Sequence, residues 1–171
     1  MKIPSLAPAM RVATLVFLGL LSTLAQAEIL TGRVVKIADG DTLTVLDASK
    51  QQHRVRLTGI DAPERKQAFG TVSRQHLAEL AFGREVSVEW HKRDRYQRIL
   101  GKVLVEGVDA NLEQVRAGLA WHYKHYARDQ HPADRTLYAE AEELASINGV
   151  GLWRDPAPIA PWDFRRKRKA E

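Results

Sequence analysis

The pattern of apolar and polar positions predicts five short strands. Val, Ile and Leu recur along each segment and alternate with polar residues where one strand face is exposed. The predicted strands cover residues 30–37, 42–46, 53–58, 85–90 and 99–105. Tight turns join the first three into a meander. The first of these turns is Asp39-Gly40-Asp41, where we expect Gly40 to take a positive φ.

Three helices are predicted from apolar positions spaced three and four residues apart. They cover 69 or 71 to 81, 111–117, and 133 or 134 to 147. The first should bury a stripe that includes Val72 and Leu77, and the third a face with Leu137, Ala141 and Leu144.

The order of these elements predicts the fold. Five short strands, one helix after the third strand and two helices after the fifth match a closed five-stranded barrel of the oligonucleotide/oligosaccharide-binding (OB) type. The fold class is therefore α+β, mainly β, with three helices. A generic α+β sandwich is the alternative that the pattern alone leaves open.

The N-terminal segment, residues 1–27, is typical of a secretory signal. Lys2 and Arg11 precede an apolar run over 12–24, and Ala25-Gln26-Ala27 forms a small-x-small cleavage site. Met10 is an alternative start, and a retained membrane anchor is an alternative role. Cleavage after Ala27 predicts export to the periplasm or the medium. We expect a monomer with no stable membrane association after cleavage.

Charge is distributed unevenly along the 171 residues. The chain carries +5 in total, of which 1–27 contributes +2 and 165–171 contributes +4, so 28–164 sum to −1. The predicted division is a signal over 1–27, a barrel domain over 28–154, and a Pro-rich extended arm with a basic tail over 155–171. Trp153 and Trp162 are expected to anchor the arm. The chain has no Cys, which excludes disulfides, thiolate metal sites and a Cys nucleophile.

The candidate chemistry centres on the sequence VRLTGIDAPE, residues 55–64. The alternating strand breaks at Gly59, and the Ala62-Pro63 turn places Asp61 and Glu64 on a loop close to Arg56. Two carboxylates and a guanidinium suit a hard metal ion and a phosphate. A surface ion-pair cluster is the alternative for such a loop taken alone.

Two further turns carry charged and polar side chains: residues 39–42, after the first predicted strand, and residues 94–98, before the fifth. Five segments follow one another along the chain: DGDT (39–42), RLTGIDAPE (56–64), DRYQR before GKV (94–103), NLEQVRAGLAW (111–121) and GLW (151–153). In these segments, over about residues 30–154, the chain resembles the staphylococcal (micrococcal) nuclease, or thermonuclease, family.

The resemblance implies a metal centre. Asp41 and Asp61 would be carboxylate ligands of one Ca²⁺, with the backbone carbonyl of Ala62 as a third protein ligand and Asp39 close by. Glu64 would orient or deprotonate the attacking water. Ca²⁺ takes oxygen ligands, and these segments supply oxygen ligands only.

The resemblance also implies how a substrate is held. Arg56 and Arg98 would bind the scissile phosphate, where two guanidiniums match the charge that grows on the phosphoryl oxygens. Tyr96 and Tyr126 would lie along the bound nucleotide. The family has a tyrosine where this chain has Lys124, which we expect to meet a phosphate while a base stacks on Tyr126.

The expected function is an exported, Ca²⁺-dependent, sugar-nonspecific nuclease acting on DNA and RNA, single strands most readily. The resemblance implies products with 3′-phosphates. A noncatalytic oligonucleotide-binding barrel is the alternative. A zinc site built on His122, His125 and His131 does not fit a common ligand spacing. The basic tail is expected to lie remote from the metal and to make no contact with the transition state.

Overall fold

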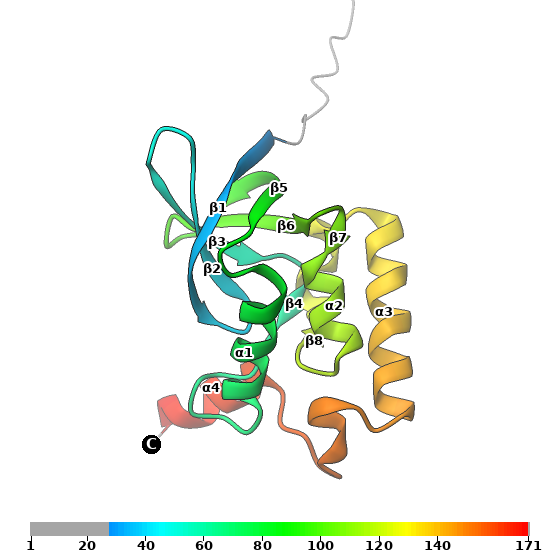
Figure 1. The fold of residues 1–171 in the computed structure, drawn as a ribbon. Helices are drawn as coiled ribbons and strands as arrows, with labels where there is room; N and C mark the ends of the chain where they lie inside the picture. The colour runs from blue at the N-terminus through cyan, green and yellow to red at the C-terminus, as the bar shows by residue number, and fades with distance from the viewer. Residues whose placement is uncertain (1–27, 171) are drawn as a thin grey trace, which may run out of the picture.

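Five strands close into a barrel in the computed structural model, which describes residues 28–170. The strands are β1 (Glu28–Asp39), β2 (Thr42–Leu46), β3 (Gln52–Leu57), β5 (Glu85–Arg93) and β6 (Ile99–Val105). They pair in the order β3-β2-β1-β5-β6, and a parallel pairing of β3 with β6 closes the ring (Figure 1). The predicted mainly β, OB-type barrel is confirmed. β1 and β5 extend beyond their predicted bounds.

Three short strands lie outside the predicted set. β7 (Val108–Asp109) continues β6 through a hairpin turn. β4 (Ile60–Asp61) and β8 (Trp121–His122) form a separate two-stranded antiparallel sheet that pairs Asp61 with Trp121. This small sheet links the end of β3 to the aromatic segment, and it becomes important for the candidate site.

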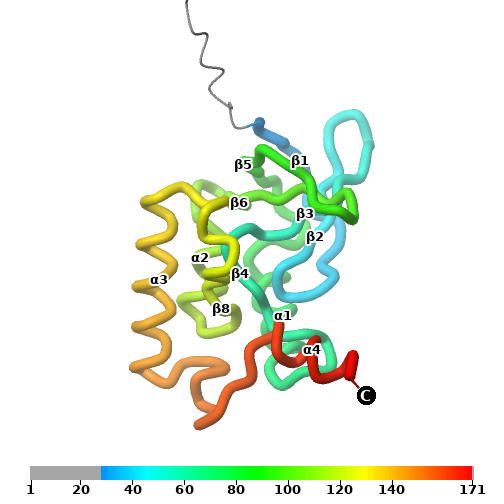
Figure 2. Tube along the Cα trace, turned by 180° about the vertical axis from the view of Figure 1, so that it is seen from behind, coloured from blue at the N-terminus to red at the C-terminus, as the bar shows by residue number. Residues whose placement is uncertain are grey.

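The helices surround one end and one side of the barrel. The three predicted helices are α1 (Gly70–Ala81), α2 (Ala110–Arg116) and α3 (Pro132–Ile147), and a fourth, α4 (Pro161–Ala170), follows them. Two 3₁₀ helices, η1 (Lys124–Asp129) and η2 (Gly151–Arg154), complete the structure. α1 packs on β1 and α2, and α3 packs on α2. Seen from the back, α4 lies beside the loop that leads into α1 (Figure 2).

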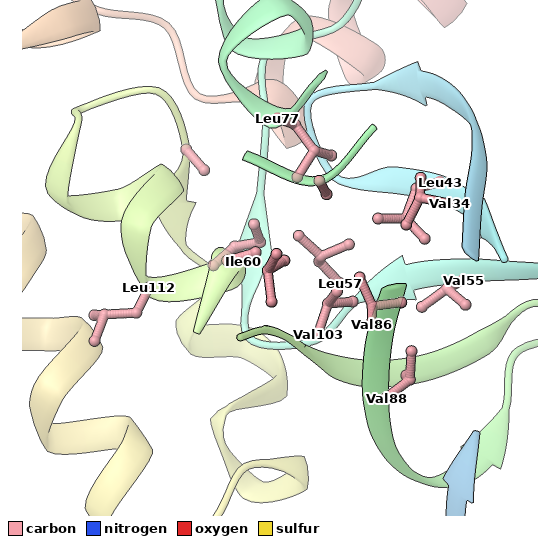
Figure 3. Close-up of a cluster of buried hydrophobic side chains, with 14 of the residues drawn as sticks. Val34, Leu43, Val55, Leu57, Ile60, Leu77, Val86, Val88, Val103 and Leu112 are labelled. Carbon is pink, nitrogen blue, oxygen red and sulfur yellow. The ribbon is translucent and has the colours of Figure 1, made fainter. Parts of the chain in front are cut away.

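The core follows the alternation of the strands. Inward positions of all five strands are buried, among them Val34, Leu43, Val55, Val88 and Val103. Leu77 of α1 points toward these side chains and closes one end of the core (Figure 3). Each such side chain stabilises the fold by about 1.5–3 kcal/mol through removal from water.

A buried asparagine ties the barrel to α2. Asn111 Oδ1 accepts from the Val103 N–H at 3.1 Å, and its Nδ2 donates to the carbonyls of Thr58 and Gly101 at 3.0 and 3.1 Å. Asp109 caps α2 by accepting from the Leu112 N–H. Asn111 therefore satisfies backbone groups at the place where β3 ends and β6 continues.

Two predicted helix faces are partly wrong, although Leu77 of α1 is buried as predicted. Val72 of α1 is exposed, and the buried face of that helix runs through Gly70, Ser73, Leu77 and Ala81. Leu137 and Leu144 of α3 are also exposed, while Ala141 is buried as predicted. The buried face of α3 consists of Tyr138, Ala141, Glu142 and Ala145. Polar contacts decide this rotation, because the Tyr138 hydroxyl donates to Asp109 and Glu142 accepts from the His122 N–H.

The C-terminal segment departs from the predicted extended arm and free tail. Pro161 begins α4, which includes most of the basic run. The expected anchoring by Trp153 and Trp162 is confirmed, because both rings contact Trp121, at centroid distances of 4.4 and 5.6 Å. No helix within residues 28–170 has the length and apolar content needed to cross a membrane. The predicted signal segment lies outside the described residues.

Candidate active site

The turn that carries Asp41 is packed against α1. A Cβ on Gly40 would lie 1.8 Å from Ser73 Oγ and 2.8 Å from the Ala62 Cβ, so only glycine fits there. Its φ is not positive, so the expected reason for this glycine is wrong and close packing is the correct one. Gln114 of α2 holds the turn by donating from Nε2 to the Gly40 carbonyl at 2.6 Å.

Arg56 joins the two predicted metal-ligand carboxylates. Its NH1 donates to Asp41 Oδ1, and its NH2 donates to Asp61 Oδ1 at 2.7 Å. Asp41 is 2% exposed and Asp61 is fully buried. The register of the barrel brings Arg56 into place, because Arg56 of β3 pairs with Thr42 of β2. Buried charges are stable only when paired, and this bridge pairs both carboxylates.

The neighbours of these groups shift their pKa values. Burial raises the pKa of Asp41, and the charge of Asp39 acts in the same direction, while Arg56 opposes both. Burial lowers the pKa of Arg56, but attraction to Asp41 and Asp61 is stronger and raises that pKa above its ordinary value. Arg56 therefore remains a cation under all conditions in which the fold persists.

The loop after β4 carries Ala62 and Glu64 to the same place. The Ala62 N–H donates to Asp41 Oδ2 at 2.8 Å, which holds this backbone against the Asp39–Asp41 turn. Glu64 is partly exposed, and its backbone N–H donates to Gln67 Oε1 at 3.1 Å. The structure thus brings Asp41, Arg56, Asp61, Ala62 and Glu64 together, as the sequence predicted. Their functional roles stay predictions.

Arg165 of α4 also enters this cluster, which the sequence did not predict. Its NH1 donates to Asp61 Oδ1 at 3.1 Å and to Glu64 Oε1 at 2.9 Å, and its NH2 donates to Asp61 Oδ2 at 2.7 Å. Burial lowers the pKa of Arg165, but the hydrogen bonds that it donates to Asp61 and Glu64 outweigh this effect and raise that pKa. The expectation that the basic tail lies remote from the site is wrong for its first residue.

Arg98 immediately precedes β6, the strand that pairs with β3 beside Arg56, and it does not join this cluster of ion pairs. It is two positions before Leu100, the residue of β6 that pairs with Arg56. Its Nε donates to Asp94 Oδ2 at 2.7 Å, and the same carboxylate accepts from the backbone N–H groups of Tyr96 and Arg98. Asp94 thereby fixes both the turn and the guanidinium.

Tyr96 lies at the surface beside this turn. Its ring is 61% exposed, and the guanidiniums of Arg95 and Arg98 lie 4.9 and 5.5 Å from its centroid. An exposed ring between two cations is a suitable surface for a nucleobase next to a phosphate. The substrate-binding role of Tyr96 stays a prediction.

The aromatic segment after β8 contains a second candidate for contact with the substrate, in addition to the predicted Tyr126. Tyr126 is exposed and meets Tyr123 edge to face at 5.0 Å. Tyr123 is the ring that stacks on Trp162, at 5.2 Å and 7° between planes. Burial raises the pKa of Tyr123, and the charge of Asp61 adds to this effect. Tyr123 is therefore a candidate contact that the sequence missed.

Lys124 and His122 have partners within the protein. Lys124 Nζ donates to Glu142 Oε2 at 2.6 Å, although the side chain is largely exposed. His122 is buried, and its Nε2 is 3.0 Å from Gln130 Oε1. Burial lowers the pKa of His122, so the neutral imidazole is favoured. The proposed phosphate contact of Lys124 therefore requires it to leave Glu142 or to share its protons.

The donor set can be tested for its fit to Ca²⁺. Asp41 and Asp61 each accept three hydrogen bonds, and an ionised carboxylate has about four acceptor positions. From the described residues 28–170, each Oδ2 accepts one hydrogen bond, which leaves it an acceptor position for a cation. Within residues 28–170 no group of three or more His, Asp or Glu side chains is arranged to hold a metal ion. Two carboxylates with backbone carbonyl, water and phosphate oxygens fit the oxygen preference of Ca²⁺.

Comparisons with known proteins agree with this geometry. The model of the family described as staphylococcal nuclease homologue matches residues 54–155. A Haemophilus influenzae protein named "Uncharacterized endonuclease" is 45% identical over 139 residues, which cover 81% of this chain and 75% of the relative. A Shigella flexneri "Micrococcal nuclease" is 43% identical over 147 residues, covering 81% and 82%. "Protein ParB" of Escherichia coli is 43% identical over 152 residues, covering 84% and 82%.

The barrel and its charged centre define the class as an OB-fold protein with a site suited to phosphate chemistry. The chain belongs to the staphylococcal nuclease homologue family. That membership supports a nuclease, a hydrolase whose substrate is nucleic acid.

Proposed function

We propose that the protein is an exported, Ca²⁺-dependent nuclease of the thermonuclease type, which hydrolyses phosphodiester bonds of both DNA and RNA. Single strands are the preferred substrates, and the products carry 3′-phosphates. The observation that carries the proposal is the buried Asp41–Arg56–Asp61 bridge with Glu64 at its rim. Family membership and the endonuclease relatives support it further. Export rests on the sequence of residues 1–27.

The residues of the candidate site have different roles in the proposed phosphodiester hydrolysis. Ca²⁺ held by Asp41, Asp61 and the Ala62 carbonyl would supply positive charge to the phosphoryl oxygens. Arg56, on β3, and Arg98, immediately before the adjacent strand β6, donate to the same oxygens as negative charge grows on them.

Glu64, at the open side of the cluster, takes a proton from the attacking water. The leaving 5′-oxygen acquires a proton from solvent, which leaves the phosphate on the 3′ side. Arg56 pairs with both Asp41 and Asp61 and holds their carboxylates in place.

Removal of Ca²⁺ is the first test. Excess EGTA is expected to lower cleavage of single-stranded and plasmid DNA by at least about 10²-fold, because a metal ion contributes several kcal/mol to stabilising the phosphoryl charge. Zn²⁺ should not restore activity, since the donors are oxygens. A Glu64→Gln variant purified in parallel controls for contaminating nucleases. Tight binding of single-stranded DNA without cleavage in any metal would instead favour a noncatalytic oligonucleotide-binding protein.

The rest of the basic run predicts a salt effect on binding. Residues 28–164 sum to −1, and residues 166–169 are exposed cations at the end of α4. Replacing them (Arg166→Gln, Lys167→Gln, Arg168→Gln, Lys169→Gln) should raise the apparent KM on long DNA at low salt. The slope of log affinity against log salt should become shallower by about 0.7–0.9 per lost phosphate contact. Turnover of a dinucleotide should stay unchanged, because Arg165 is retained. Equal salt slopes for the two proteins would leave these cations without an electrostatic role.

A further inference from the structure

Helix α4 is held against the candidate site by aromatic and polar contacts. Trp162 stacks face to face on Tyr123, and its edge meets Trp121. Gln67 donates from Nε2 to the Ile159 carbonyl at 2.5 Å, while its Oε1 accepts from the Glu64 N–H. One side chain thus connects the Glu64 loop to the segment that enters α4.

Because of the helical spacing, docking of α4 places one of its cations at the candidate site. Trp162 and Arg165 are three residues apart, so they share the face of α4 that meets the protein. Arg166 points elsewhere: its side chain is 78% exposed and pairs with Asp163 of the same helix. Docking of α4 therefore delivers Arg165, and not its neighbour, to Asp61 and Glu64.

Glu64 depends on this contact for its orientation. Its side chain is 31% exposed, and Arg165 is the hydrogen-bond donor to its carboxylate among residues 28–170. An exposed glutamate without a partner rotates among several conformers, whereas a general base must face its water in one of them. The bidentate pair with Asp61 fixes the guanidinium, and the guanidinium in turn fixes Glu64.

Arg165 also retains donors for a substrate. A guanidinium has five N–H groups, and three of them are used on Asp61 and Glu64. The two that remain can meet a phosphate without release of either carboxylate. The side chain is 33% exposed, so it is reachable from the surface where Glu64 opens.

We propose that Arg165 is a positioning residue of the nuclease site: carried in by α4, it holds the Glu64 carboxylate beside Asp61 in the orientation needed to activate water. This inference rests on the proposed function. It makes α4 a part of the catalytic unit, whereas its terminal cations act only in long-range attraction.

The test compares Arg165→Ala, Arg165→Lys and the control Arg154→Ala, at an exposed arginine outside α4, in the full chain. On a short single-stranded oligonucleotide at saturating Ca²⁺, Arg165→Ala should lose at least about tenfold in kcat with KM within about twofold. Arg165→Lys should recover only part of the lost kcat, since one ammonium group cannot hold two carboxylates as the planar guanidinium does. Arg154→Ala should match the wild type. Thermal unfolding of each variant checks that the fold is retained.

Calorimetric titration with Ca²⁺ gives a readout independent of activity. Loss of a cation that touches Asp61 should tighten Ca²⁺ binding by about tenfold or more, through the removed repulsion. Unchanged Ca²⁺ affinity in Arg165→Ala would overturn the inference, because the contact would then not exist in solution. Tighter Ca²⁺ binding with equal or higher kcat would also overturn it, since Arg165 would then be only a competitor of the metal.

Comparison of the wild-type protein with Arg165→Ala distinguishes failure of this inference from failure of the proposed function. A wild-type protein without nuclease activity would refute the proposed function and this inference together. An active wild type alongside an undiminished Arg165→Ala would refute the inference alone.

Discussion

Arg56→Ala is expected to lower kcat by about 10²-fold or more on a short single-stranded substrate. The variant loses a preorganised donor to the phosphoryl oxygens, and the loss of one such donor typically costs that much. It also leaves Asp41 and Asp61 without the guanidinium that bridges them. The matched control is Arg54→Ala, since Arg54 is an exposed cation of the same strand and has the same alternation phase. A folded Arg56→Ala variant with nearly wild-type kcat would contradict the assigned role.

The same variant should show how closely the metal and the fold are linked. Removing one partner of a buried ion pair costs about 3–5 kcal/mol, because the remaining charges stay buried. Ca²⁺ should restore part of this loss by neutralising Asp41 and Asp61, so urea unfolding is to be compared with Ca²⁺ and with EGTA. A stability loss unaffected by Ca²⁺ would argue against these two carboxylates as metal ligands.

Local signals explain why the barrel was predictable. Each strand alternates Val, Ile or Leu with polar residues, and turns with glycine or polar residues stand between them. The break at Gly59 is equally local, since it has a φ of 76° and ends the meander. The cluster around Asp61 follows from that break, because the chain after it has little freedom before Pro63.

Arg165 was not predictable by the same means. Its contact with Asp61 spans 104 positions, and the run 165–169 has the composition of a solvated tail. A signal for helix α4 does exist in the sequence: Pro161 stands at its first position and Asp163 in its first turn. That signal predicts a helix but not its docking, which depends on the stacking of Trp162 over Tyr123.

Buried polar residues account for the other misses. Gln114 lies on α2 with no exposure, and its amide holds both the Gly40 carbonyl and Ser73. Amphipathic patterning assigns such a glutamine to the surface, since the pattern does not represent hydrogen bonds to a distant turn. The rotation of α3 has the same cause, because Glu142 turns inward to accept from the His122 N–H.

Arg98→Ala is the second substitution with a large expected effect, again about 10²-fold or more in kcat. Arg98 immediately precedes β6, which pairs with the strand of Arg56, and Asp94 holds one edge of its guanidinium through Nε and NH2. NH1 and the second N–H of NH2 can then donate together to two phosphoryl oxygens. Burial works against an ionised Asp94, but hydrogen bonds from Arg98 and Tyr96 are stronger and lower its pKa, so this hold persists at neutral pH.

Conservative variants separate the charge of Arg98 from its geometry. Arg98→Lys should recover little turnover, because an ammonium cannot donate in a fork to two phosphoryl oxygens while it pairs with Asp94. Arg95→Ala is the matched control. Arg95 belongs to the same turn and also lies over the Tyr96 ring, but its side chain is exposed. The kcat of Arg95→Ala should stay near the wild-type value. Full turnover in Arg98→Lys would show that Arg98 acts through its charge alone and not by donating to two phosphoryl oxygens at once.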